Sequence, residues 1–358
     1  MNLGIPGGRR VTPAGAAIVG GTAVVAAAAV TLSLTLTHGA ASTAAAGKQA
    51  SARLSASSCT GPAGAAYVAV AGYQAFDAVN TANCALVQQY NVGDGVVPNT
   101  GTSDTNYDST DEGVAISGDT LYFADTGNNT VAVINAANLS VSNYNPAETL
   151  IPVGQDPESL AVTPNGSQVW VADTGPQTGL PSLGGISVIS TATDKVTSTL
   201  SLPVDPRAVA FSPSGSTAYV TTSAGLFVIN TATVKVTGLV PGLGDPEDVA
   251  VSTDGKTVYV TNTARNLVDV ISAASNRVTG TIPVGQLPWQ LALSSNGGTL
   301  YVANGDSNSV SVIDTASGKV KDTIADPGDP VSLALSPDGS ELWVGGLTSG
   351  VVSVFDTS

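Results

Sequence analysis

The stretch PWQLALSSNGGTLYVANGDSNSVSVIDTASGKVKDTIADPG, residues 288–328, decides the fold. It contains four short segments in which apolar and polar residues alternate: Trp289–Ser294, Thr299–Asn304, Ser309–Asp314 and Lys319–Ala325. Each segment is bounded by Gly, Asn, Asp, Ser or Pro, which is typical of half-buried strands joined by turns. The stretch therefore predicts a unit of four β-strands.

The same unit recurs along most of the chain. An alanine in the first strand returns about every 40 to 49 residues, at Ala115, Ala161, Ala210, Ala250, Ala292 and Ala334. An aromatic residue followed by Val or Phe marks the second strand seven times, at Tyr67-Val68, Tyr122-Phe123, Trp170-Val171, Tyr219-Val220, Tyr259-Val260, Tyr301-Val302 and Trp343-Val344. A four-stranded unit of this length is a propeller blade. We therefore predict an all-β fold, a seven-bladed β-propeller of four-stranded blades over residues 67–358.

A solenoid of stacked coils is the alternative, because it also repeats a strand unit. The chain ends favour a ring. Tyr67–Val92 aligns without a gap onto Tyr301–Asp326 as second, third and fourth strands, whereas the C-terminus stops after a third strand, Val351–Asp356. We expect the segment of about Lys48–Cys59, within a linker at residues 47–66, to close the ring by completing the last blade. It could instead be a degenerate first strand of the first blade.

The N-terminus predicts export. Residues 1–46 contain no Asp or Glu, carry Arg9 and Arg10, and run apolar over 14–36 before the small residues at 44–46. This order of charge, apolar core and small-residue cleavage site is that of a signal peptide. The apolar run is also long enough to span a bilayer uncleaved, so a retained N-terminal membrane anchor stays open. A twin-arginine route ranks second. We expect a secreted or cell-surface protein.

The charge and the cysteines lie in the exported part. Residues 47–358 hold all 27 acidic residues and ten of the twelve basic ones, a net charge of −17. A surface this negative repels phosphate backbones, so we expect no nucleic-acid partner. Cys59 and Cys84 are the two cysteines, and an even pair in an oxidising compartment predicts a disulfide.

Missing residue types limit the chemistry. His38 is the one histidine and Met1 the one methionine, and both precede residue 47. Once the signal peptide is removed, this excludes a Ser-His-Asp hydrolase, a histidine-ligated zinc or copper centre, and haem with His or Met as axial ligand. No cofactor is identified. Carboxylate chemistry or an oxygen-ligated metal such as calcium remains open.

The second-strand motif resembles that of a known family. Tyr259-Val260-Thr261-Asn262 follows the turn Ser252–Gly255, and Tyr301–Asn304 with Val310–Asp314 repeats the pattern. These residues are similar to the YVTN-repeat β-propeller family, of the YncE-like and surface-layer kind. The resemblance implies a propeller that is exported or surface-associated. It implies no particular activity, because the shared motif is structural, although some members are similar to quinoprotein or lactonase propellers.

Because successive strands of a blade run in opposite directions, their connecting loops lie alternately on the two faces of the ring. Second-to-third and fourth-to-first connections share one face, which we call the upper face. Its loops vary, with a long Gly/Pro-rich connection at Asp173–Gly185 and an acidic insertion at Asp94–Glu112. Variable loops on a rigid scaffold are where binding residues collect, so we expect function on the upper face.

One register at this face is a candidate site. The residues three before each first-strand alanine should enter the innermost strands at the channel mouth; they are Glu112, Glu158, Arg207, Glu247, Trp289 and Val331. Acidic neighbours surround them, namely Asp111, Asp156, Asp205, Asp245, Asp248 and Asp329. Converging carboxylates beside an Arg and a Trp could hold a calcium ion, a cationic ligand or a sugar. Alternatively, these residues serve turn chemistry and solvation alone.

The sequence favours a monomeric binding or interaction module that acts outside the cytoplasm on a protein or glycan partner, with no catalytic constellation. One alternative is a divalent-metal-dependent, lactonase-like hydrolase that uses Glu158 or Glu247 as its base. A second alternative is a structural cell-envelope protein, which predicts self-association and no small ligand.

Overall fold

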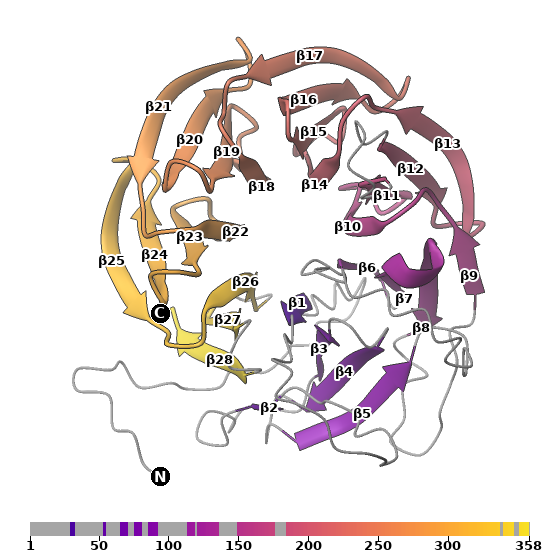
Figure 1. Ribbon diagram of the computed structural model, residues 1–358, viewed down its shortest axis with the longest axis horizontal. Coiled ribbons are helices and arrows are strands. Elements are labelled where there is room, and N and C mark those ends of the chain that lie inside the picture. Colours follow the sequence, from indigo (N-terminus) through magenta and orange to yellow (C-terminus); the bar gives the residue numbers. More distant parts are fainter. Residues whose placement is uncertain are drawn as a thin grey trace, which may run out of the picture.

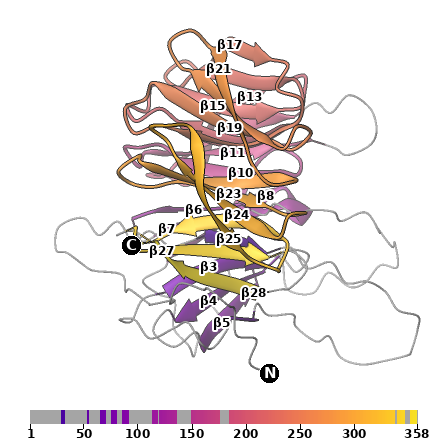
Figure 2. The same cartoon turned by 90° about the vertical axis from the view of Figure 1, so that its left-hand side faces the viewer.

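The fold is all-β. The computed structural model describes residues 113–118, 120–135, 149–175, 184–336, 339–346 and 351–357, and five strands closer to the N-terminus. Apart from one short 3-10 helix, η1 (Thr126–Asn128), the regular elements of this part are strands. Figure 1 shows them arranged radially around a central axis, and Figure 2 shows the same ring edge-on. No helix in the described part is long and apolar enough to cross a membrane.

Five blades consist of four consecutive antiparallel strands (Figure 1). The first two contain β6 (Val114–Ser117), β7 (Thr120–Asp125), β8 (Thr130–Asn135) and β9 (Thr149–Pro152), then β10 (Pro157–Val162), β11 (Gln168–Asp173), β12 (Gly185–Ser190) and β13 (Lys195–Ser201). The next two contain β14 (Pro206–Phe211), β15 (Thr217–Thr222), β16 (Gly225–Asn230) and β17 (Lys235–Pro241), then β18 (Pro246–Val251), β19 (Thr257–Asn262), β20 (Leu267–Ser272) and β21 (Arg277–Pro283). The fifth contains β22 (Pro288–Leu293), β23 (Thr299–Asn304), β24 (Ser309–Asp314) and β25 (Lys319–Ala325).

A sixth blade ends the chain. It contains β26 (Pro330–Leu335), β27 (Glu341–Gly346) and β28 (Val351–Asp356), with the two-residue strand β2 (Arg53–Leu54) as its outer member. β2 runs parallel to β28. These two residues fall within the expected closing segment, whose other residues lie outside the described part of the chain. That this segment closes the ring therefore stays a prediction.

Six regular blades correct the predicted count of seven. The remaining four-stranded sheet combines β3 (Ala65–Val70), β4 (Ala75–Asn80) and β5 (Ala85–Asn91) with β1 (Ala29–Leu32). β1 is parallel to β3, whereas the first and second strands of each regular blade are antiparallel. The sequence just before Tyr67 lacks the first-strand pattern of the repeat. The place beside β3 is therefore taken by β1, which lies within residues 1–46 and runs parallel to β3.

The core lies between neighbouring blades. Trp170 and Ile186 belong to the β10–β13 blade, and they share one buried cluster with Val220 and Ile229 of the next blade. The Trp170 ring meets the ring of Phe211 edge-on, with centroids 5.5 Å apart and an interplanar angle of 88°. The aromatic residue of the repeated pair thus fills the space between two blades, where edge-to-face contacts of large rings are favourable.

On the lower face, which is opposite the upper face, a repeated hydrogen bond connects the turn between the first and second strands to the residue that follows the third strand. Gly215 has a φ of 70°, which suits glycine, and its N–H donates to the Ser212 carbonyl at 2.8 Å. Thr231, which follows the third strand, donates from Oγ1 to the Gly215 carbonyl at 2.6 Å. Thr191 makes the same bond to Gly166 at 2.7 Å and Thr315 to Gly297 at 2.6 Å. The turn Ser212-Pro213-Ser214-Gly215 is therefore a structural element of the blade.

The upper face gathers the other connections. The Thr263 N–H, between β19 and β20, donates to the Asp245 carbonyl, between β17 and β18, at 3.0 Å. The Gly305 N–H makes the equivalent bond to the Leu287 carbonyl at 3.0 Å. Second-to-third and fourth-to-first connections therefore share one face, which confirms the predicted arrangement of the loops.

Candidate functional site

The mouth of the central channel contains a small cavity of about 70 Å³. The beginnings of the innermost strands line it through Gly113, Glu158, Ser159, Ala208, Glu247, Asp248, Trp289, Gln290, Val331 and Ser332. The structure thus brings together Glu158, Glu247, Trp289 and Val331 of the predicted register, because each follows the proline that begins its first strand. Glu112 lies outside the described residues.

Arg207 belongs to the same register but reaches toward the next blade. Its Nη1 donates to Asp245 Oδ1 at 2.6 Å and to Glu247 Oε2 at 2.7 Å, and its Nε lies 3.8 Å from Asp205 Oδ2. The Arg207 and Glu247 side chains are only 23% and 14% exposed, so solvent screens this pair less than a surface pair. One guanidinium therefore links two blades and neutralises part of the acidic rim.

The pKa values of this cluster reflect the pairing. Burial by itself lowers the pKa of Arg207, but the charges of Glu247 and Asp245 outweigh it and raise the pKa. Burial by itself raises the pKa of Asp245, but hydrogen bonds from Thr263 and Arg207 together with the Arg207 charge lower it. Both groups are therefore held in their charged forms.

In two first strands, the residue after the predicted register has a structural role that sequence reasoning missed. Asp248 Oδ2 accepts a hydrogen bond from the Leu291 N–H at 2.9 Å, and Gln290 Oε1 accepts one from the Leu333 N–H at 2.6 Å. Each bond joins the innermost strand of one blade to that of the next. Since both acceptors stand two residues before a first-strand alanine, the repeat period is the signal that could have revealed them.

The mouth offers no ready ligand set for the calcium or lactonase hypotheses. Within the described residues, no three His, Cys, Asp or Glu side chains are grouped as metal ligands. Glu247, one of the two expected bases, is engaged by Arg207. The geometry suits electrostatic recognition better than proton abstraction.

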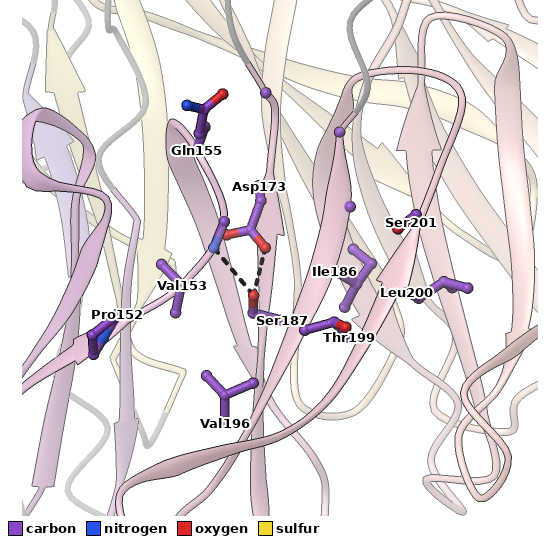
Figure 3. Close-up of a pocket in the computed structure, with 14 residues that line it drawn as sticks. Pro152, Val153, Gln155, Asp173, Ile186, Ser187, Val196, Thr199, Leu200 and Ser201 are labelled. Atoms are coloured by element: carbon purple, nitrogen blue, oxygen red, sulfur yellow. Dashed lines mark hydrogen bonds between the residues drawn. The ribbon is translucent and has the colours of Figure 1, made fainter.

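A second cavity of about 300 Å³ lies at the upper end of the β10–β13 blade (Figure 3). Its lining includes Asp173, at the end of β11, and Ser187 of β12. Ser187 Oγ donates to Asp173 Oδ2 at 2.6 Å, and the Gly154 N–H donates to Ser187 Oγ at 3.3 Å. Figure 3 shows these three groups joined between the strands.

Asp173 is buried, with 4% of its surface exposed. Burial raises the pKa of Asp173 to about 7, although hydrogen bonds from the Ser187 side chain and the Gly154 and Ser187 backbones lower it in part. Its Oδ1 accepts no hydrogen bond. Sequence reasoning had placed Asp173 only at the start of a variable loop. The missed signal is that Asn262 and Asn304 hold the equivalent position in other blades.

Several other predicted residues lie outside the described part of the chain. They are Cys59 and Cys84, whose disulfide stays a prediction, and Asp111. The signal segment, residues 1–46, is described only at β1, so export also stays a prediction.

The family follows from a sequence-model comparison. A model of the choice-of-anchor I domain matches residues 62–292. The chain belongs to the choice-of-anchor I domain family. The matched region of this choice-of-anchor I domain contains Glu158, Asp173, Arg207, Glu247 and Trp289, so both cavities fall largely within it. The YVTN resemblance holds at the level of propeller architecture, and membership of that family stays a prediction.

Solved structures support the fold. Hydrazine synthase from Kuenenia stuttgartiensis is 18% identical with a TM-score of 0.65, covering 82% of this chain and 92% of that one. A functionally unknown protein from Desulfotomaculum acetoxidans DSM 771 is 16% identical with a TM-score of 0.61, covering 80% of this chain and 90% of that one. At such identities the likeness shows the fold of the choice-of-anchor I domain alone. No curated protein matches the chain.

Proposed function

We propose that this choice-of-anchor I domain is a cell-surface binding module that captures a cationic group of a protein or glycan partner at the channel mouth. The observation that carries the proposal is the convergence of Glu158, Glu247, Asp248 and Trp289 on one cavity.

Charge favours a cation there. Arg207 pairs with the acidic residues of the rim, since Asp205, Asp245 and Glu247 all face it. Its single charge leaves the cluster negative, and Glu158 adds to that negative potential. A unit charge about 4 Å from a carboxylate gains about 4 kcal/mol at an effective dielectric constant of about 20, before desolvation is subtracted. A negatively lined mouth also concentrates cations by focusing the field.

The size and shape of the cavity limit which ligands can enter it. A cavity of about 70 Å³ has room for one ammonium or guanidinium head, not for a whole sugar ring. Trp289 is half-buried at the same mouth, and its ring can add a cation–π contact of about 0.5–2 kcal/mol. We infer that a lysine or arginine side chain, or the amino group of a glycan, enters the mouth while the rest of the partner contacts the upper-face loops.

Two finer features complete the proposal. The chain is exported through its N-terminal segment, and the residues around β2 close the ring against β28. The β2–β28 pairing and the name of the family agree with this arrangement.

The test is calorimetric binding of N-acetyl-Gly-Lys-Gly-amide to the full chain, with the same peptide acetylated on the lysine Nε as the uncharged control. We expect binding that weakens at least fivefold on Glu158→Gln or Trp289→Leu and falls from 20 to 300 mM NaCl. Asp306→Asn, an exposed carboxylate on the same face, is the matched control and should bind normally. Equal affinity for the uncharged control peptide would rule out charge recognition. The lactonase alternative instead predicts metal-dependent lactone hydrolysis, and the structural alternative predicts concentration-dependent self-association.

A further inference from the structure

The cavity at the upper end of the β10–β13 blade is separate from the channel mouth, since the two share no lining residue. Five groups of residues form it: the end of β9 with the β9–β10 connection, the end of β11, both ends of the β11–β12 connection, β12 and β13 (Figure 3). At about 300 Å³ it reaches the lower end of the range of small-molecule sites.

Its walls combine one carboxyl group with aliphatic side chains. Val153, Ile186, Val196 and Leu200 supply the apolar surface. Asp173 is the one ionisable side chain among the described residues that line the cavity. Hydroxyl groups of Thr199 and Ser201 stand at the same cavity. This composition suits a ligand with one positive charge and a short aliphatic part.

Asp173 has one carboxylate oxygen, Oδ1, that no hydrogen bond satisfies. Asn262 Oδ1 and Asn304 Oδ1 are in the same state, but of the three residues only Asp173 lines one of the two cavities. Asn262 Nδ2 donates to Asp269 Oδ2 at 2.8 Å and Asn304 Nδ2 donates to Ser311 Oγ at 2.9 Å, so those amides supply donors within their own blades. A carboxylate can only accept. Ser187 gives its proton to Asp173 Oδ2, and Oδ1 receives none. A buried acceptor without a donor is unfavourable, and a cation that donates hydrogen bonds would relieve it.

The cavity coincides with a departure from the repeat. The connection between β11 and β12 runs over residues 174–184, whereas the β19–β20 and β23–β24 connections run over only 263–266 and 305–308. The two ends of the longer connection, Gly175 and Gly184, line the cavity together with Asp173. We propose that this cavity binds a primary ammonium group carried on a short aliphatic chain, with Asp173 as its counter-ion.

Binding of this kind is linked to a proton. Because burial raises the pKa of Asp173 to about 7, the carboxyl is mostly protonated at pH 6 and mostly ionised at pH 8.5. The ammonium group stays charged at both values, since alkylamines titrate near pH 10. The cation must displace the proton at the lower pH, so affinity should fall about tenfold from pH 8.5 to 6.

The experiment is calorimetric titration with pentylamine of the full chain carrying Glu158→Gln, which weakens the channel mouth proposed above, using 1-pentanol as the uncharged probe of the same length. We expect pentylamine to bind at pH 8.5 and about tenfold more weakly at pH 6. Titrations at pH 6 in two buffers of different ionisation enthalpy should show release of close to one proton per amine bound. Pentanol that binds as tightly as pentylamine, or an affinity that does not change with pH, would overturn the proposal.

Two variants, each made in the Glu158→Gln chain, locate the site, and Asp306→Asn in the same chain is the control. Asp173→Asn removes the charge and should abolish the pentylamine binding that remains. Thr199→Trp leaves Asp173 in place but fills the cavity from an exposed position, so it should abolish this binding as well. Asp306→Asn should bind pentylamine as the Glu158→Gln chain does. Normal binding by either cavity variant would disprove the assignment.

Discussion

Replacing Asp173 by Asn should stabilise the protein in alkali and have little effect in acid. The pKa of Asp173 rises from its ordinary 3.8 to about 7 in the fold. The folded state therefore holds a proton that the unfolded state releases between about pH 4 and pH 7, so stability falls as pH rises through this window and stays lowered above it. A displacement of about three pH units corresponds to about 4 kcal/mol.

The asparagine variant has no such proton. Its side-chain oxygen can accept the Ser187 hydroxyl bond that Asp173 Oδ2 accepts now, and Asn304 shows that an amide fits beside a serine hydroxyl at this position. At pH 8.5 we expect the variant to exceed the parent chain by up to about 4 kcal/mol in free energy of unfolding. At pH 5, where the carboxyl is protonated in the fold, most of that gain should vanish.

Urea unfolding of both proteins at pH 5 and 8.5 measures the effect, since all other titrating groups are shared and cancel in the difference. Asp306→Asn is the control, because an exposed carboxylate should change stability by less than about 0.5 kcal/mol at either pH. A gap between variant and parent that is equal at the two pH values would show that burial does not perturb the Asp173 carboxyl.

Two further substitutions test the packing of the ring. Trp170→Ala empties the space between two blades, where the side chain is 0% exposed, and should lower the free energy of unfolding by about 3–5 kcal/mol in urea titrations. Thr231→Val removes the bond from Oγ1 to the Gly215 carbonyl and should cost about 1 kcal/mol in the same assay. The second change should leave the fold intact, because Ala273 holds the equivalent position in the next blade.

The regular part of the fold was accessible from sequence because its signals are local. The predicted strands Thr299–Asn304, Ser309–Asp314 and Lys319–Ala325 match β23, β24 and β25 residue for residue. The predicted first strand, Trp289–Ser294, begins one residue late because the proline before it also joins the ladder. The blade count failed where the repeat lacks its first strand, since nothing in the sequence indicates that β1 would pair with β3.

Only part of the candidate sites could be predicted from the sequence. Counting back three residues from each first-strand alanine placed Glu158, Glu247 and Trp289 at one mouth, because equivalent positions of a ring converge on its axis. It did not predict that Arg207 would turn toward Glu247, since that pairing depends on side-chain directions between two blades. Asp173 escaped notice because its environment comes from Gly154 and Ser187, which belong to other strands or connections.

The residues that follow the repeat and those that break it have different roles. Asp248 and Gln290 accept hydrogen bonds from the backbone of the next blade, and Asn304 forms a hydrogen bond within its own blade. Such internal hydrogen bonds make the ring rigid. A ligand needs groups that this internal bonding leaves over. Asp173 places a carboxylate oxygen without a donor at a cavity, and Trp289 stands where three other blades carry Glu158, Arg207 and Glu247. In a ring built from one repeated unit, the positions that depart from the pattern are therefore where binding should be sought.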